Sequence, residues 1–131
     1  MYVRYLPDAK LTPGDTLAVT KADVCAPGYS SKVRDVPQSV KNDVYTEYDI
    51  VSHAPAAYEV DHLISLELGG SNSERNLWPE SYKGPWNAHI KDKLESHLHE
   101  LVCKNQLSLK VAQRAIATDS IAAYHTYIGG Q

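Results

Sequence analysis

The sequence predicts an α+β fold, with a strand–loop–strand unit flanked by helices and preceded by an irregular N-terminal segment. Two observations carry this prediction. Apolar and β-branched residues gather at residues 58–68, whereas apolar residues recur at helical spacing in most of the chain that follows. A chain of 131 residues that is 43% hydrophobic suffices for one domain, over residues 1–131.

The first 35 residues contain turn signals and little periodicity, so we expect an extended segment with a short strand at residues 17–19. Pro37 suits a first helical turn, and the apolar residues after it recur at helical spacing, so residues 37–48 are predicted to form a helix.

The segment 58–68 is predicted to start as a strand, and residues 69–73 form a Gly- and Ser-rich loop. Residues 76–79 are short and apolar, and Pro79 limits them to the end of a second strand.

Three helices are predicted in the C-terminal part of the chain. The first covers residues 86–104, with an apolar stripe that includes Leu94 and Leu98. Ser108 caps a second helix through residue 117, and Thr118 or Asp119 caps a third, which ends at residues 129–130.

Charge and aromatic content restrict the classes of function. Thirteen basic and 16 acidic side chains give a net charge of -3, which is unfavourable for a general polyanion binder. A nucleic-acid partner would therefore need locally gathered basic residues and a metal ion. The chain has nine Tyr, two Trp and no Phe; half-buried packing explains most of them, and such an excess of Tyr also suits contact with nucleic acid or sugar.

The two cysteines, Cys25 and Cys103, lie 78 positions apart. No close C-x-x-C pair exists, which argues against a zinc finger or ribbon. Cysteine chemistry alone leaves two readings open: two buried thiols or one long-range disulfide.

The residues that carry chemistry lie between residues 58 and 93. Asp61 and His62 place a carboxylate next to an imidazole, and Asn76 follows His62 by 14 positions. The predicted long helix then opens with Asn87 and His89.

With its D-H pair, its L-x-L-G-G-S-N loop at residues 66–72 and its N-L-W-P segment, the chain resembles the HNH endonuclease family, whose core is a ββα-metal unit. The likeness to the core covers residues 58–95, within an expected core region of 58–104. A subgroup of small HNH-like proteins also resembles this chain at V-C-x-P-G-Y-S, V-R-D-V-P and A-Q-R-A-I-A, so nearly the whole chain is covered.

The resemblance implies a metal-dependent endonuclease that hydrolyses phosphodiester bonds of DNA, with RNA as the alternative substrate. His62 matches the general base, because an imidazole can accept a proton from water near neutral pH. Asp61 matches a metal ligand, and Asn76 matches the residue that fixes the loop. On a regular strand Asp61 and His62 would point to opposite faces; the family implies a distorted strand end that lets both serve one site.

The third motif position departs from the family, since the usual spacing leads to Pro85, which has no side-chain ligand atom. Asn87 and His89 are the candidates, and they lie about 200° apart around a helix, so both cannot face one ion. Helical phase favours Asn87. With Asp61 and Asn87 as oxygen ligands we expect one divalent ion, Mg²⁺ or Mn²⁺; His89 in place of Asn87 would favour Zn²⁺ or Ni²⁺.

Nearby polar side chains have simpler readings. Glu59 and Glu67 are read as solvated or structural, and Glu67 has a second reading in which it orients His62. His97 and His99 are read as surface residues. The cations are read either as phosphate contacts or as solvated side chains; they are Arg75, Lys83, Lys91 and Lys93.

The subgroup resemblance includes both cysteine positions and so favours a Cys25–Cys103 disulfide, which implies a periplasmic or secreted protein. The first ten residues lack the apolar core of a signal peptide, so a cytoplasmic location stays open. We expect a monomer that binds nucleic acid and no membrane. The alternative function is an HNH-like module that binds nucleic acid or another partner without catalysis, favoured by the displaced third ligand and the acidic net charge.

Overall fold

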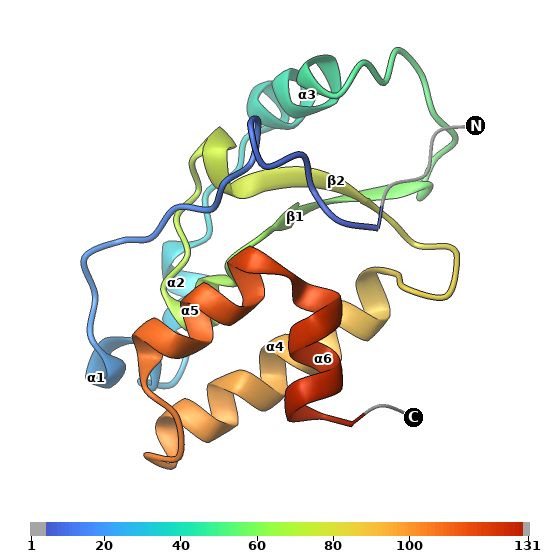
Figure 1. Ribbon diagram of the computed structural model, residues 1–131. Helices are drawn as coiled ribbons and strands as arrows, with labels where there is room; N and C mark the ends of the chain where they lie inside the picture. Colours follow the sequence, from blue (N-terminus) through green and yellow to red (C-terminus); the bar gives the residue numbers. More distant parts are fainter. Residues whose placement is uncertain (1–4, 130–131) are drawn as a thin grey trace.

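A two-stranded antiparallel hairpin lies between helices on both of its sides in the computed structural model, which describes residues 5–129 (Figure 1). The elements are, in chain order, α1 (Lys21–Val24), α2 (Tyr29–Val33), α3 (Gln38–Glu47), β1 (Tyr58–His62), β2 (Leu77–Ser81), α4 (Ala88–Cys103), α5 (Leu109–Thr118) and α6 (Ser120–Tyr127). Single 3₁₀ turns at Leu66–Leu68 and Glu74–Asn76 occupy the connection between the strands. The predicted α+β class is confirmed, and Gly130, predicted to help end the last helix, lies outside the described residues.

The predicted C-terminal helices are present, and their caps are the expected residues. Ser108 accepts a hydrogen bond from the backbone of α5, and Asp119 does the same for α6. The segment 58–68 starts as a strand, as predicted, and β1 ends at His62; Ser65 then caps the 3₁₀ turn that begins at Leu66.

The predicted strand at residues 17–19 is wrong. Only Thr16 forms an isolated bridge, to Gly70, and the chain then enters α1. Thr20 and Asp23 form a reciprocal capping box there, which stabilises a helix too short to show apolar periodicity.

Strand register decides which side chains share a face of the hairpin. Glu59 pairs with Glu80 and Asp61 with Trp78, whereas His62 pairs with Leu77. Directly opposite residues share a face and successive residues alternate. The two acids of β1 and Glu80 therefore leave one face, and His62 leaves the other.

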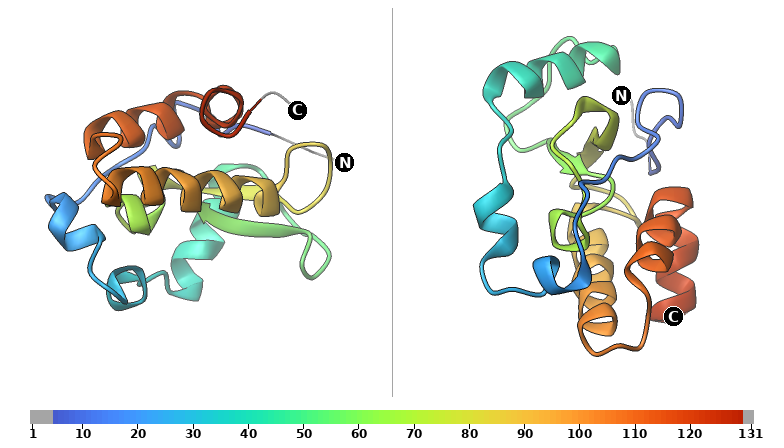
Figure 2. Two further views of the ribbon diagram at one scale, coloured as in Figure 1. Left: turned by 90° about the horizontal axis from the view of Figure 1, so that it is seen from below. Right: turned by 90° about the vertical axis from the view of Figure 1, so that its left-hand side faces the viewer.

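Two hydrophobic cores pack around this hairpin, which has helices on both of its sides (Figures 1 and 2). In the smaller core, Val44 and Tyr48 from the α3 region are grouped with Leu63, Leu77 and Trp78, although the register puts Trp78 on the face of Asp61 and Glu80. The larger core joins the C-terminal helices to the 3₁₀ turn after β1; its buried members are Ile64, Leu68, Trp86, Leu94, Leu98, Val102, Ala112, Ile116 and Ala123. No helix within residues 5–129 is long and apolar enough to cross a membrane.

Cys25 and Cys103 form a disulfide, as the subgroup resemblance implied. Cys25 is the C-cap of α1 and Cys103 is the last residue of α4. The bond therefore ties the N-terminal helices to the far end of the longest helix.

Replacing both cysteines, in the double variant Cys25→Ala/Cys103→Ala, is expected to lower the free energy of unfolding by up to about 4.5 kcal/mol, because the bond closes a loop of 78 residues in the unfolded chain. Urea denaturation of the oxidised protein and the double variant measures this loss. Two titratable thiols in the denatured, unreduced wild type would contradict the pairing.

Candidate functional site

Asn76 holds the connection between the strands through both polar atoms of its buried amide. Its Nδ2 donates to the carbonyl oxygens of Ile64 (3.0 Å) and Ser71 (2.8 Å), and its Oδ1 accepts from the Ile64 N–H (3.0 Å). A Cβ on Gly70 would lie 1.7 Å from the Ile64 oxygen, so only glycine fits beside this amide. Asn76 thus fixes the backbone that immediately follows His62.

His62 is 6% exposed and is held by Asn72. Asn72 Nδ2 donates to the Val33 carbonyl (2.8 Å), and its Oδ1 accepts from the Asp35 N–H (3.3 Å). The amide orientation is thereby set, and the same Oδ1 lies 3.0 Å from His62 Nε2. His62 must therefore carry its proton on Nε2 in the neutral ring, which leaves the lone pair on Nδ1.

Burial lowers the pKa of His62 below its usual value of 6.5. The hydrogen bond to Asn72 and the charge of Asp61 oppose this pKa shift, whereas the charges of Arg34 and Lys91 add to it. The ring is therefore neutral at pH 7, which is the form that accepts a proton.

A polar groove with a volume of about 520 Å³ opens at His62, on the α3 side of the hairpin. Its cations are Arg34 and Lys41, and Glu59 is its acid. The other residues that line it are Val36, Gln38, Asn42, Tyr45, His53, Tyr58, Val60 and Tyr82. The locally gathered basic residues that an acidic chain needs for a phosphate ligand are present here.

Asp61 lies on the opposite face, in a buried ion-pair network with α4. The Lys91 ammonium is 2.6 Å from Asp61 Oδ2, 2.6 Å from Glu95 Oε2 and 2.9 Å from the His62 carbonyl oxygen. Three acceptors thus satisfy its three N–H groups, and Lys91 is only 1% exposed. The reading of Lys91 as a phosphate contact or a solvated side chain is wrong.

The distorted strand end implied by the resemblance is not seen. The ladder runs on through His62, so Asp61 and His62 leave β1 on opposite faces. The backbone at His62 still joins the two faces, since its carbonyl accepts from the lysine that binds Asp61.

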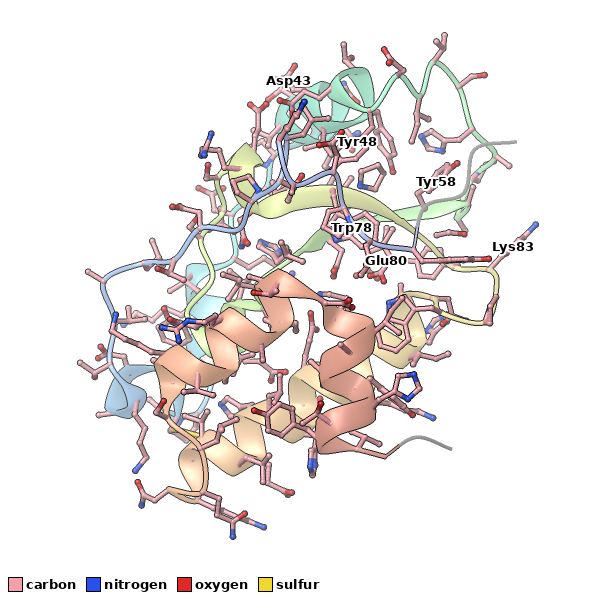
Figure 3. The ribbon with its side chains drawn as sticks, in the orientation of Figure 1. Asp43, Tyr48, Tyr58, Trp78, Glu80 and Lys83 are labelled. Atoms are coloured by element: carbon pink, nitrogen blue, oxygen red, sulfur yellow. A yellow bond between two sulfur atoms is a disulfide. The ribbon has the colours of Figure 1, made fainter. Side chains whose placement is uncertain are left out.

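Acidic side chains cluster around Asp61 on the α4 side. Carboxylate oxygens of Glu59, Asp61 and Asp92 lie within 4.8 Å of one another. Glu80, directly opposite Glu59, points toward α4 (Figure 3), and neither of its oxygens has a hydrogen-bond partner among the described residues. An all-oxygen donor set of this kind fits a hard divalent cation.

Two of these acids bind protons unusually well. Burial, followed by the negative charge of Asp61, raises the pKa of Glu80 to about 10 and that of Glu59 to about 7. Glu80 is therefore an uncharged carboxylic acid at neutral pH. Glu59 also lines the groove at His62, so it links the acidic cluster to the opposite face.

Asn87 lies at the N-terminus of α4 as its cap. Its Oδ1 accepts from the backbone N–H groups of His89 (3.0 Å) and Ile90 (3.2 Å), and its Nδ2 donates to the Gly84 carbonyl (3.0 Å). The His89 ring packs on Tyr82, with ring centroids 5.2 Å apart. The oxygen predicted to bind a metal is thus already used by the helix backbone.

The side chains of α4 that lie beside Asp61 are those of Lys91 and Asp92. The sequence interpretation did not assign Lys91, Asp92 or Glu59 to a site around Asp61, although two signals were visible. Glu59 and Asp61 are two apart on a strand and so share a face, and Lys91 and Glu95 have the i,i+4 spacing of a helical ion pair.

The remaining polar candidates lie elsewhere. Asn72 lies within hydrogen-bond distance of the Nε2 atom of His62. The charged side chains that shift the pKa of Glu67 are those of His99, Asp92 and Arg34. His99 is half-buried beside the disulfide, where its Nε2 lies 3.0 Å from the Val24 carbonyl oxygen. Asn72, rather than Glu67, thus holds His62 Nε2, and His99 is not a surface residue.

Replacing Glu80 by Gln is expected to stabilise the protein at alkaline pH. Because the folded pKa of Glu80 is raised to about 10 from 4.5, the folded state binds a proton that the unfolded state releases. Stability from this group is therefore complete in acid and is lost as the pH rises from 4.5 toward 10, at up to about 1.4 kcal/mol per pH unit. Thermal melting across this range, with chelator present, is expected to show a shallower decline for Glu80→Gln; an unchanged decline would contradict the uncharged state.

Comparisons with protein-family models, curated proteins and solved structures found no match for this chain.

Proposed function

We propose that the protein is a metal-dependent endonuclease of the HNH type, which hydrolyses phosphodiester bonds of DNA, with RNA as the alternative substrate. The observation that carries the proposal is the state of His62. Its ring is neutral, Asn72 holds the proton on Nε2, and the ring borders a groove that also contains Arg34 and Lys41. The strand–strand–helix order of β1, β2 and α4 supports the same class.

Each residue has a role in this proposal. Arg34 and Lys41 attract the phosphate backbone into the groove. His62 accepts the proton of the attacking water through Nδ1, and Asn72 keeps the ring in the tautomer that can do so. Asn76 acts indirectly, by holding the loop that carries Asn72.

The residues that would hold the metal are Asp61, Glu59 and Asp92, whose all-oxygen donor set suits Mg²⁺ or Mn²⁺. Of these, Glu59 also lines the groove at His62, so it is the ligand that would bring a bound ion toward the phosphate, where the ion would supply positive charge for the leaving 3′ oxygen. Asn87, the ligand predicted from helical phase, could join this set only by giving up its hydrogen bonds to the start of α4. The disulfide supports an oxidising compartment, so a periplasmic or secreted location is part of the proposal. A monomeric state is also part of the proposal, as the sequence led us to expect.

The metal test uses Asp92→Asn, because Asp92 is exposed and its replacement spares the core. We expect its Mn²⁺ affinity, measured by calorimetry, to fall roughly tenfold or more, with loss of plasmid nicking at low metal concentration and recovery at high concentration. Asp43→Asn, an exposed acid on α3, is the matched control and is expected to bind Mn²⁺ like wild type (Figure 3). If Asn87→Ala abolished binding and Asp92→Asn left it intact, the ligand set predicted from the sequence would be the correct one.

The second candidate is a nucleic-acid-binding module that has lost catalysis. It is favoured by Lys91, whose ammonium occupies Asp61 Oδ2, where a metal ion would otherwise bind. Absence of plasmid nicking by folded, Mn²⁺-loaded protein that still binds nucleic acid would establish this candidate.

A further inference from the structure

Three aromatic rings gather at one part of the groove that contains His62. The Tyr45 and His53 ring centroids lie 4.4 Å apart, and the Tyr58 ring meets both edge-on, at 6.3 and 5.7 Å. Tyr45 comes from α3, His53 from the connection after it and Tyr58 from the start of β1. We call these three residues the aromatic cluster.

The aromatic cluster is not part of either hydrophobic core within the described residues. His53 is exposed, Tyr45 and Tyr58 are half-buried, and all three line the groove. Flat, amphipathic rings that are held against one another and open to a groove form a surface on which another planar group can stack.

Positive charge lies in the same groove. Arg34 precedes α3, and Lys41 is on α3, one helical turn before Tyr45. The one acid that lines the groove among the described residues, Glu59, accepts a hydrogen bond from the Tyr82 hydroxyl at 3.1 Å. The groove therefore contains two cations that could bind phosphate groups and an aromatic surface on which a nucleobase could stack.

We infer that this groove binds single-stranded nucleic acid, with phosphates at Arg34 and Lys41 and a nucleobase stacked on the aromatic cluster. Backbone cations combined with aromatic rings bind single strands with little dependence on sequence, because every base has a face that can stack. A base paired inside a duplex is already stacked on its neighbours and must be unstacked before it reaches such rings. The inference rests on the proposed function, which gives nucleic acid as the substrate class, and adds that the bound nucleic acid is single-stranded.

The test measures binding without cleavage. A fluorescently labelled oligothymidylate is titrated with the protein in chelator, next to an abasic strand of equal length and a duplex of equal length. We expect the oligothymidylate to bind roughly 5- to 150-fold more tightly than the abasic strand, the range that one stacked base provides. The duplex is expected to bind more weakly than the oligothymidylate.

Two groups of variants separate stacking from charge. Tyr45→Ala and His53→Ala are expected to weaken oligothymidylate binding within the same range and to leave the abasic strand unchanged, and Tyr45→Phe, which keeps the ring, is expected to bind like wild type. Arg34→Ala is expected to weaken both strands and to reduce the salt dependence of log K by about 0.7 for each phosphate that the protein no longer neutralises. Arg114→Ala on α5 and His125→Ala on α6, both exposed, are the matched controls.

Equal affinity for the abasic strand, preference for the duplex, or equal losses on both strands in Tyr45→Ala would each overturn the inference. Thermal melting of every variant checks that the fold is kept. Tyr45→Phe removes only the hydroxyl group, so it separates the contribution of the aromatic ring from that of the hydroxyl. Plasmid nicking and cleavage of the labelled strand in Mn²⁺ form a separate arm. Stacking-dependent binding without cleavage would keep the inference and defeat the endonuclease; cleavage without stacking-dependent binding would do the reverse.

Discussion

His62→Ala is expected to reduce the DNA cleavage rate by roughly 10² to 10⁴, the usual contribution of a general base. His62 lines the groove and is held through Nε2 by Asn72, whereas the metal candidates Asp61, Glu59 and Asp92 are grouped around Asp61 on the other face of the hairpin. Metal affinity is therefore expected to stay near that of wild type, and added Mn²⁺ is not expected to restore the rate. His62→Gln is the sharper variant, since its amide can still donate to Asn72 but cannot accept a proton at neutral pH.

The pH dependence of cleavage tests the same assignment. Only the neutral ring accepts a proton, so the rate is expected to rise from acid and to reach half its plateau below pH 6.5, because burial lowers the pKa of His62. The exposed His125 supplies the control variant, His125→Ala, which is expected to reproduce the wild-type profile. Comparable rates for wild type, His62→Ala and His62→Gln would show that His62 is not the base.

Lys91→Met is expected to reduce the free energy of unfolding by about 3–5 kcal/mol. The change keeps most of the side-chain volume but removes the charge that Asp61 and Glu95 share in the interior. A loss of this size is a large part of the roughly 5–15 kcal/mol that stabilises a typical small protein. Urea denaturation measures it, and Lys93→Met, an exposed neighbour on α4, is the control with no more than a small expected effect.

The loss in Lys91→Met is expected to grow with pH. Without the ammonium, which opposes the rise that burial causes in the pKa of Glu95, the folded pKa of Glu95 is higher, so the folded variant binds a proton that its unfolded state releases, and its stability falls as the pH rises. The double variant Lys91→Met/Glu95→Gln removes one of the uncompensated acids and is expected to recover part of the stability. Equal urea midpoints for Lys91→Met and Lys93→Met would show that the buried network contributes little.

The helices that could be predicted from the sequence are those marked by apolar residues at helical spacing and by turn residues at their ends. Residues 37–48 and 86–104 were predicted from spacing and turn residues, and α3 and α4 differ from those ranges by one or two residues at each end. The short helix α1 was missed because four residues show no periodicity, although the Thr20–Asp23 capping box was readable in the sequence.

The network around Asp61 could not be predicted in the same way. Lys91 lies outside the apolar stripe of its helix and therefore reads as solvated. Its burial depends on a carboxylate that is 30 positions earlier in the chain and on a register that places Asp61, rather than His62, on the α4 face. Helical phase likewise predicts the direction of the Asn87 side chain. It does not predict that the backbone N–H groups of the first helical turn bind the side-chain oxygen as an N-cap.

The side-chain amide of Asn72 connects two parts of the groove, the backbone around Arg34 and the ring of His62. Its two backbone partners, Val33 and Asp35, flank Arg34, while the same amide oxygen binds the His62 ring. Any displacement of the backbone at Arg34 must therefore either carry the imidazole with it or break one of these hydrogen bonds. If the groove binds a ligand at Arg34 and His62 acts as the base, as proposed, the two events would be linked through Asn72, and a substitution that loosens residues 33–35 would be expected to alter both.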